Sequence, residues 1–316
     1  MAANYIYTYG YNDDEGALAL MEMRAFFGYT ATNKVVVSTV SIDPSRSVFI
    51  REKMHVLIEA ESEHQLMEQA HTCGHVDESY KVVFMKHDRL KEHSGYGNSE
   101  RLQLTRTIGN EMPGPLDLKH PDQVYAVTVV EGRFYLGHYE KSEPVWMKHV
   151  NKPQGYSTAL NARTARTLVN ILNPHAKPLK LMDPCCGIGT LLVEAASMEI
   201  AMSGRDKNPL ACVGARENLA YYNYPLQMDV QVGLIQDVED FYDAVVVDLP
   251  YNLYTHSSYD QQMDLIHHAA RIADRVVIVT IEPMDEAIQA AGLRIVDRAE
   301  TIKQRFKREI LLCEKS

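Results

Sequence analysis

The chain has 316 residues and a mass of 35.8 kDa, which suits two domains better than one because single cores stop growing near ~250–300 residues. Apolar residues make up 46% and charged residues 23%, a composition that excludes disorder as the main state. The net charge of −10 excludes nonspecific polyanion binding through bulk charge, although a local basic patch can still bind a folded RNA.

The apolar runs, such as residues 244–247, are much shorter than the ~18 residues of a membrane helix. The first eleven residues lack the basic start and apolar stretch of a signal peptide. The five cysteines are odd in number and have no scaffold-like spacing, which favours reduced thiols. We therefore expect a cytoplasmic protein with no membrane association.

The first half of the chain predicts an α+β region. Its expected strands span residues 5–11, 34–41, 55–59, 80–86, 125–130 and 134–139, and its expected helices span 15–27 and 62–73. Residues 110–121 contain three prolines and a glycine and are expected to form a loop. The stretch 143–155, with two prolines, predicts a linker.

The second half alternates strand and helix patterns. Strands are expected at 179–183, 200–206, 228–235, 243–249 and 275–281, and helices at 190–198, 208–222 and 260–273. This alternation predicts a doubly wound parallel α/β sheet. Two further strands, 293–299 and 309–314, have no helix between them, which predicts an antiparallel last strand because parallel neighbours need a longer crossover.

The strongest motif is Asp183-Pro-Cys-Cys-Gly187-Ile-Gly189-Thr190, between an expected strand and an expected helix. The two glycines allow a tight turn and a close backbone approach to a ligand, and the helix start offers free N–H groups. Leu192 stands where the third glycine of a dinucleotide fingerprint would be. The motif therefore favours a smaller nucleoside ligand.

Acidic residues follow the next two strands. Asp206 lies 19 residues after Gly187, a separation typical of an acid that binds ribose hydroxyls. The alternative is that Asp206 caps the following helix, with Pro209 in its first turn. Asp237, after the third strand, could reach the amino group of an adenine or could be a solvated loop acid.

The fourth strand ends in Asp248-Leu249-Pro250-Tyr251 at the sheet edge where ligands bind in such folds. The Asp248 carboxylate and the carbonyl at the Leu249–Pro250 step can accept both protons of a planar exocyclic amine, and Tyr251 can stack on the base. A helix-capping turn is the alternative. The motif predicts transfer of a group to an amine.

Together these motifs resemble class I S-adenosylmethionine-dependent methyltransferases that methylate amines. Asp-Pro-x-Cys-Gly-x-Gly-Thr followed by Leu-Leu-x-Glu-Ala is similar to the tRNA guanosine-10 N2-methyltransferase family and its THUMP-containing relatives. Residues 154–161 and the pattern Ala165-Arg166-x-Leu168-x-Asn170 resemble that family's linker, which folds onto the cofactor. The resemblance covers residues 150–316, including the closing strand 306–313.

The resemblance implies a Rossmann-like sheet of seven strands with the last one antiparallel. It implies S-adenosylmethionine as cofactor, no metal, and catalysis by Asp248, Leu249, Pro250 and Tyr251. The cofactor contacts that it implies are Tyr156, Ser157, Asp183, Cys185, Gly187, Gly189, Thr190, Asp206, Lys207, Gln236 and Asp237.

The first half resembles the family's RNA-binding portion: residues 5–73 look ferredoxin-like and residues 80–139 look like a reduced THUMP domain. The expected division is therefore 1–145 for RNA binding, 146–178 for the linker and 179–316 for the methyltransferase domain. The implied substrate is an exocyclic amine in tRNA or another structured RNA, with guanine N2 preferred. The rivals are a DNA adenine or protein amino-methyltransferase, a noncatalytic RNA-binding protein that retains the pocket, and a nicotinamide-dependent oxidoreductase. The sequence leaves open the oligomeric state and the need for a small activating subunit.

Three weaker features have structural alternatives. His71-x-Cys73-x-His75 lacks a second pair at zinc-ligand spacing, so a structural role is favoured over a metal site. Cys185 and Cys186 lie in the cofactor turn, so packing is favoured over a nucleophilic role. The basic cluster Arg298, Lys303, Arg305, Lys307 and Arg308 is either a solvated hairpin tip or a phosphate contact.

Overall fold

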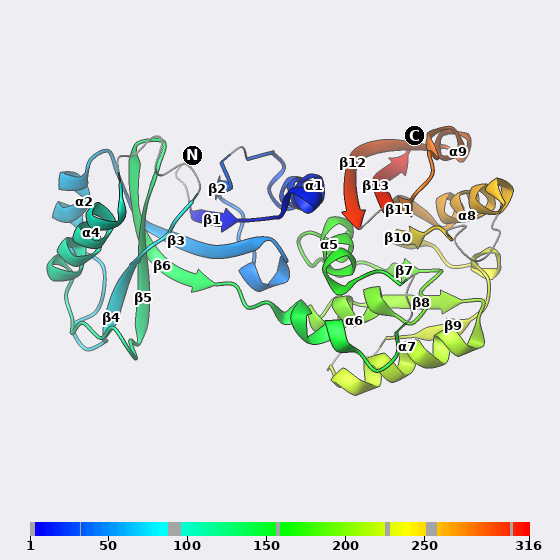
Figure 1. Cartoon of the computed structure of the whole chain (residues 1–316), viewed down its shortest axis with the longest axis horizontal. Coiled ribbons are helices and arrows are strands. Elements are labelled where there is room, and N and C mark those ends of the chain that lie inside the picture. The colour runs from blue at the N-terminus through cyan, green and yellow to red at the C-terminus, as the bar shows by residue number, and fades with distance from the viewer. Residues whose placement is uncertain are drawn as a thin grey trace. The chain divides into compact units, whose positions relative to one another are not determined.

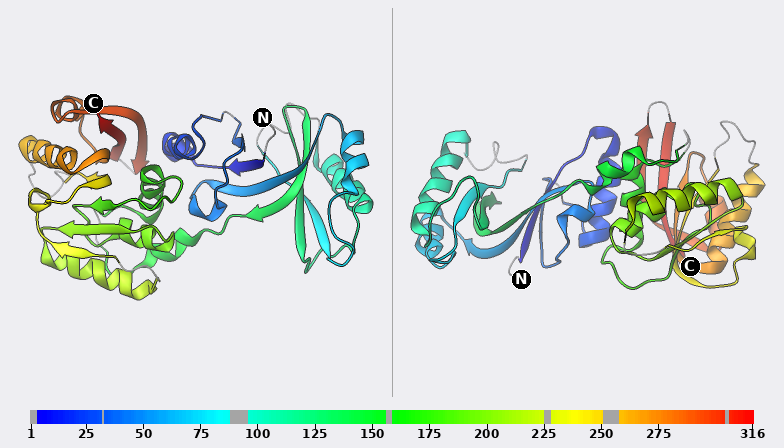
Figure 2. Two further views of the ribbon diagram at one scale, coloured as in Figure 1. Left: turned by 180° about the vertical axis from the view of Figure 1, so that it is seen from behind. Right: turned by 90° about the horizontal axis from the view of Figure 1, so that it is seen from below.

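A computed structural model describes residues 4–31, 33–87, 96–155, 159–224, 228–250, 258–303 and 306–316. The chain divides into two compact units, shown in Figure 1 and from two further sides in Figure 2. Unit 1 consists of residues 1–10, 31–45 and 49–143, and unit 2 consists of residues 11–30, 46–48 and 144–316. Each unit is built on its own sheet.

Unit 1 contains a six-stranded sheet with the order β2-β1-β3-β6-β5-β4. Its strands are β1 (Tyr5–Tyr9), β2 (Val35–Ser38), β3 (Ile50–Ala60), β4 (Tyr80–Phe84), β5 (Gln123–Val130) and β6 (Arg133–Lys141). Neighbouring strands are antiparallel except for β4 and β5, which are parallel. Helices α2 (Glu63–Ala70) and α4 (Asn98–Glu111) contribute Leu66 and Leu104 to an apolar cluster with Tyr125. Unit 1 is thus α+β, as expected.

Within that class, unit 1 differs from the expectation in two details. In a ferredoxin-like βαββαβ arrangement the helical crossover makes the first two strands parallel, whereas β1 and β2 are antiparallel neighbours here. Helix α4 occupies residues that carried no helix prediction and includes Asn110 of the expected loop. Only Leu104, Ile108 and Gly109 of this helix are buried, so its apolar stripe is too narrow to give a clear helical period.

Unit 2 contains a seven-stranded sheet with the order β12-β13-β11-β10-β7-β8-β9. Its strands are β7 (Leu181–Asp183), β8 (Met202–Asp206), β9 (Val230–Val232), β10 (Tyr242–Asp248), β11 (Ala273–Thr280), β12 (Leu293–Lys303) and β13 (Phe306–Lys315). Strand β13 lies between β11 and β12 and is antiparallel to both, while the other neighbouring pairs are parallel. This arrangement confirms the predicted α/β class and the antiparallel last strand.

Six α-helices are described in unit 2: α1 (Gly16–Phe27), α5 (Ala162–Leu172), α6 (Thr190–Ser197), α7 (Pro209–Tyr222), α8 (Tyr259–Ile272) and α9 (Asp285–Ala290). Helix α9 was not predicted. The short 3-10 turns are η1 (Asp13–Glu15), η2 (Pro44–Arg46), η3 (Val145–Asn151) and η4 (Ile235–Asp237). Residues 245–247 of β10 are fully buried, as expected for a strand covered on both faces. No described helix is long and apolar enough to cross a membrane.

Helix α1 belongs to unit 2, although the sequence analysis placed its residues in the N-terminal region. Buried polar contacts explain this position. Asn170 on α5 donates a hydrogen bond to the Glu22 carboxylate on α1 at 2.7 Å, and the Ser47 hydroxyl donates to the same carboxylate. Arg163 also forms a bidentate ion pair with the Glu15 carboxylate. Local sequence patterns do not report such long-range pairing.

Candidate active site

The glycine motif forms the turn between β7 and α6. Gly187 has a φ of +52° and Gly189 a φ of +74°, conformations that glycine adopts without strain. A Cβ atom on Gly189 would lie 2.9 Å from the Cβ of Ala215 on α7, so the turn is packed directly against that helix. Thr190 is the first residue of α6 and is buried. The turn is therefore tight, as its sequence predicts, and its predicted close approach to a ligand stays a prediction.

Asp183 ends β7 and is almost completely buried. Its Oδ1 accepts a hydrogen bond from the Cys185 N–H at 3.2 Å. Its Oδ2 is buried and has no hydrogen-bond partner among the described residues. A buried carboxylate oxygen without a donor is costly, so a ligand that brings a donor or a positive charge would stabilise the charged form of Asp183.

Asp206 ends β8 and joins the glycine turn to the second strand. Its Oδ2 accepts the Gly187 N–H and its Oδ1 accepts the Asn208 N–H, both at 2.8 Å. Asn208, not Asp206, is the N-cap of α7, because its side chain accepts the Leu210 N–H. Each Asp206 oxygen keeps a second lone pair, so the carboxylate can still accept hydrogen bonds from a diol. Lys207 is exposed.

Gln236 and Asp237 lie in η4, after β9, and both side chains are exposed. The Asp237 Oδ2 accepts the Leu234 N–H at 3.3 Å, which fixes the turn. Arg271 on α8 donates to the Gln236 carbonyl at 3.3 Å. These contacts support a local structural role for Asp237, and its expected adenine contact stays a prediction.

Asp248 ends β10 and is half-buried. The N–H of Leu249 donates to the Val279 carbonyl at 3.0 Å, which extends the pairing of β10 with β11 by one residue. The Pro250 carbonyl accepts a hydrogen bond from the Gln262 side chain at 3.1 Å. The N-cap of α8 is Ser258, so Asp248 does not cap that helix. Tyr251, like Tyr156 and Ser157, lies outside the described residues.

The carboxyl ends of β7, β8 and β10 bring three acids near one another. Burial raises the pKa of Asp183 well above its ordinary range, the Cys185 N–H lowers it, and the negative charges of Asp248 and Asp206 raise it further. This mutual repulsion is relieved when a cationic ligand enters. The sheet edge is therefore an acidic site suited to a cationic ligand.

The two cysteines of the turn are not activated. Burial raises the pKa of the Cys185 and Cys186 thiols, and the negative charge of Asp183 raises both further. A thiolate is the reactive form, so neutral thiols at these positions fit the packing role. The structure thus supports the packing interpretation over a nucleophile.

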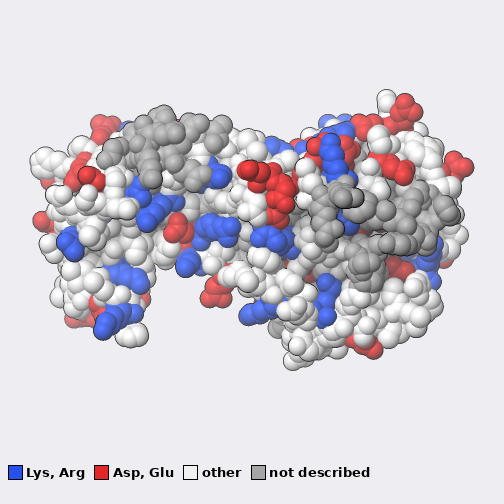
Figure 3. All heavy atoms as spheres, in the orientation of Figure 1, with Lys and Arg blue, Asp and Glu red and all other residues white. Residues whose placement is uncertain are grey.

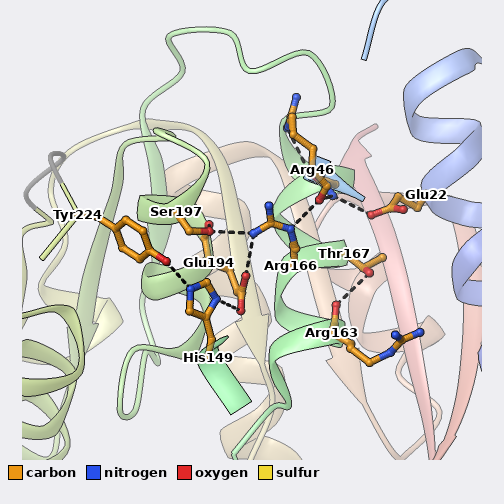
Figure 4. A network of polar contacts seen from close by, with 10 residues as sticks. Glu22, Arg46, His149, Arg163, Arg166, Thr167, Glu194, Ser197 and Tyr224 are labelled. Atoms are coloured by element: carbon orange, nitrogen blue, oxygen red, sulfur yellow. Dashed lines mark hydrogen bonds and ion pairs between the residues drawn. The ribbon is translucent and has the colours of Figure 1, made fainter. Parts of the chain in front are cut away.

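A buried polar network around Glu194 connects η3, α5 and α6, as Figure 4 shows. This network was not predicted. Glu194 on α6 accepts a hydrogen bond from Arg166 on α5 at 3.0 Å and contacts the His149 Nδ1 at 2.7 Å. Arg166 also donates to the Ser197 hydroxyl, and the His149 Nε2 lies 2.5 Å from the Tyr224 hydroxyl. Arg166 and Glu194 both stand in motifs of the resemblance, which was the available signal. The network fixes η3 and α5 against α6.

The basic cluster on the β12–β13 hairpin is largely neutralised. Arg298 forms ion pairs with Asp285 and Glu309, and Lys307 pairs with Glu300. Arg308 is buried, and the side chains of residues 303 and 305 lie outside the described part. Figure 3 shows basic and acidic side chains together on the face that it draws. These ion pairs weaken the case for a phosphate contact at the hairpin.

The structural role favoured for the stretch His71-x-Cys73-x-His75 is confirmed at Cys73, which packs in the core of unit 1. Cys73 is buried in the apolar cluster of unit 1, and no group of three potential ligands that could hold a metal ion exists among the described residues. All five cysteines are free thiols.

The strand order, the antiparallel strand between β11 and β12, and the glycine turn define unit 2 as a class I methyltransferase fold. Residues 150–281 match the model of the UPF0020 family, an RMKL-like methyltransferase domain. This part of the chain is therefore similar to methyltransferase domains of that family.

The chain is 29% identical over 172 residues to the tRNA (guanine(10)-N2)-dimethyltransferase of Methanothermobacter thermautotrophicus. This match covers 50% of the chain and 49% of the relative, so the chain spans about half the length of this curated relative. Among solved structures, TrmN from Thermus thermophilus aligns with 99% of both chains at 15% identity and a TM-score of 0.48. Magnesium protoporphyrin IX methyltransferase from Synechocystis PCC 6803 aligns with 52% of the chain and 86% of its own at 17% identity and a TM-score of 0.44.

Proposed function

We propose that the protein transfers a methyl group from S-adenosylmethionine to an exocyclic amine of RNA, with guanine N2 in tRNA as the target. The observation that carries this proposal is the acidic edge of the sheet in a methyltransferase domain, where Asp183, Asp206 and Asp248 interact electrostatically. The 29% identity to a tRNA guanine-N2 dimethyltransferase supports the choice of substrate.

S-adenosylmethionine fits the residues that are present. It carries an ammonium and a sulfonium, which complement the three acids and the unpartnered Oδ2 of Asp183. The ribose hydroxyls suit the remaining lone pairs of Asp206. The positive φ angles of Gly187 and Gly189 give the turn the tight backbone that a closely bound ligand requires.

The chemistry requires little from the protein beyond positioning. S-adenosylmethionine supplies an electrophilic methyl group. The Asp248 carboxylate and the Leu249 carbonyl accept the two N–H groups of the target amine, which directs the nitrogen lone pair at the methyl carbon. A nitrogen–carbon bond forms as the carbon–sulfur bond breaks, and the excess proton on nitrogen passes to Asp248 or to solvent. No covalent enzyme intermediate is needed.

In this proposal unit 1 contacts the RNA and places the target base. The support is the resemblance of residues 80–139 to a reduced THUMP domain and the α+β architecture of unit 1. The overall negative charge means that such contacts come from local groups and not from the field of the whole chain.

The test is transfer of label from S-adenosylmethionine into unmodified bulk tRNA, followed by nucleoside analysis. Label in N2-methylguanosine is the expected result. Label in another nucleoside retains the reaction and overturns the target. Transfer to DNA or protein instead overturns the RNA substrate, and cofactor binding with no transfer to any of the three supports a noncatalytic protein or one that lacks an activating subunit.

A further inference from the structure

Gln262 is a polar residue in an apolar part of unit 2. It lies near the start of α8, it is only 2% exposed, and one helical turn further along Ile266 belongs to the same buried apolar cluster as Leu249. Its Nε2 donates to the Pro250 carbonyl at 3.1 Å. The side chain is therefore attached to the corner that follows Asp248.

The other half of the Gln262 carboxamide has no partner. Its Oε1 is buried and makes no hydrogen bond to any described residue. A buried acceptor without a donor destabilises the fold, and a methionine or leucine at this position would avoid that penalty. Helix α8 thus carries an acceptor that no described residue of the chain uses.

The hydrogen bond to the Pro250 carbonyl attaches this acceptor to the segment that would bind the target amine. Pro250 directly follows Leu249, whose carbonyl is the proposed partner of one amine proton, and Gln262 fixes the Pro250 carbonyl. Enzymes that act on a base read it through hydrogen bonds to its Watson–Crick edge. Guanine presents a ring N1–H beside its 2-amine, whereas adenine presents a lone pair on N1 beside its 6-amine.

We propose that Gln262 is a specificity-determining residue that accepts the N1–H of the target base through Oε1. This inference rests on the proposed function. The carboxamide is held by its Nε2, so Oε1 is oriented before the base enters. A guanine satisfies it, while a base with a ring acceptor there leaves two lone pairs facing each other, and such a base is rejected.

The test compares two tRNA transcripts, one with guanine at the methylated position and one with 2,6-diaminopurine, which keeps the 2-amine but has an acceptor at N1. Wild-type protein should prefer guanine by roughly 10- to 100-fold in kcat/KM. Gln262→Met should lose most of this preference with an unchanged KM for S-adenosylmethionine. The matched control is Gln261→Met, because Gln261 is exposed and its side chain only caps α8.

A second variant covers the case in which Gln262→Met does not fold. Gln262→Leu also removes the carboxamide and should lose the preference for guanine in the same way. A preference equal to that of wild type in either folded variant overturns the inference alone. A wild-type protein that places no label in guanine overturns both the inference and the proposed function.

Discussion

Replacing Glu22 by Gln should make the protein more stable above neutral pH. Glu22 is completely buried between α1 and α5. Burial raises its pKa from 4.5 to about 7, against the opposing effects of the Ser47 and Asn170 hydrogen bonds and the Arg166 and Arg46 charges. Glutamine can accept the Asn170 hydrogen bond and donate to the Ser47 hydroxyl, so the substitution removes the charge and keeps both contacts.

The sign and size follow from proton linkage. Between pH 4.5 and 7 the folded protein holds a proton at Glu22 that the unfolded chain has lost. The free energy of unfolding is therefore unaffected by Glu22 below this range and falls as pH rises through it. At about 1.4 kcal/mol per tenfold change in proton affinity, the full effect is about 3 kcal/mol. The advantage of Glu22→Gln should therefore grow from about 1 kcal/mol at pH 5 to about 3 kcal/mol at pH 8.

The assay is urea unfolding at four pH values, followed through the fluorescence of the single tryptophan. Trp146 lies in η3 of unit 2, with the Arg163 guanidinium 4.7 Å from its ring centre, so it reports on the unit that contains Glu22. Glu239→Gln, at an exposed position of the same unit, is the matched control. A stability difference that does not change between pH 5 and pH 8 would refute the reasoning.

Three further predictions concern the site. Asp248→Ala should abolish turnover and leave the affinity for S-adenosylmethionine near that of wild type; loss of both would make Asp248 a cofactor or structural residue. Because burial raises the pKa of Asp183 and a cation favours its charged form, S-adenosylmethionine binding should release a proton and weaken as pH falls through that raised pKa. Calorimetry in two buffers of different ionisation enthalpy measures this release, which Asp183→Asn should remove. Gly189→Ala should lower the free energy of unfolding in denaturant by about 1–3 kcal/mol, because the added Cβ meets Ala215 and the residue has a positive φ. Gly155→Ala, where the added Cβ meets no atom within 4 Å, should lower it little. Equal effects of the two substitutions would contradict the packing argument.

The fold of unit 2 was largely predictable because the sequence patterns that specify its elements are local. The valine run of β10, the glycines of the turn and the alternation of strands and helices each act within about ten residues of chain, and the expected sheet follows from them. The positions of Asp183, Asp206 and Asp248 at strand ends follow from the same pattern. Their ligand contacts stay predictions.

Helix α4 was missed because its stability is tertiary. Threonines and a glycine interrupt its pattern. The helix is held by packing and by the Tyr80 hydroxyl, which lies 2.6 Å from the Gly109 carbonyl and 2.9 Å from the Met112 carbonyl and shares its one proton between them. The pairing of Glu22 with Asn170 spans 148 residues, and no period in the sequence encodes it. Gln262 was missed because a single glutamine in an amphipathic helix carries no signal of its own.

The membership of α1 in unit 2 has a consequence for synthesis. On the ribosome, α1 emerges 148 residues before Asn170, the α5 residue that satisfies Glu22. At about 5–20 residues per second this interval is about 7 to 30 s. During that time Glu22 lacks its α5 partner, and Ser47 supplies its hydrogen bond from within unit 2. Completion of unit 2 therefore requires α5 to pack against a helix that was synthesised long before it.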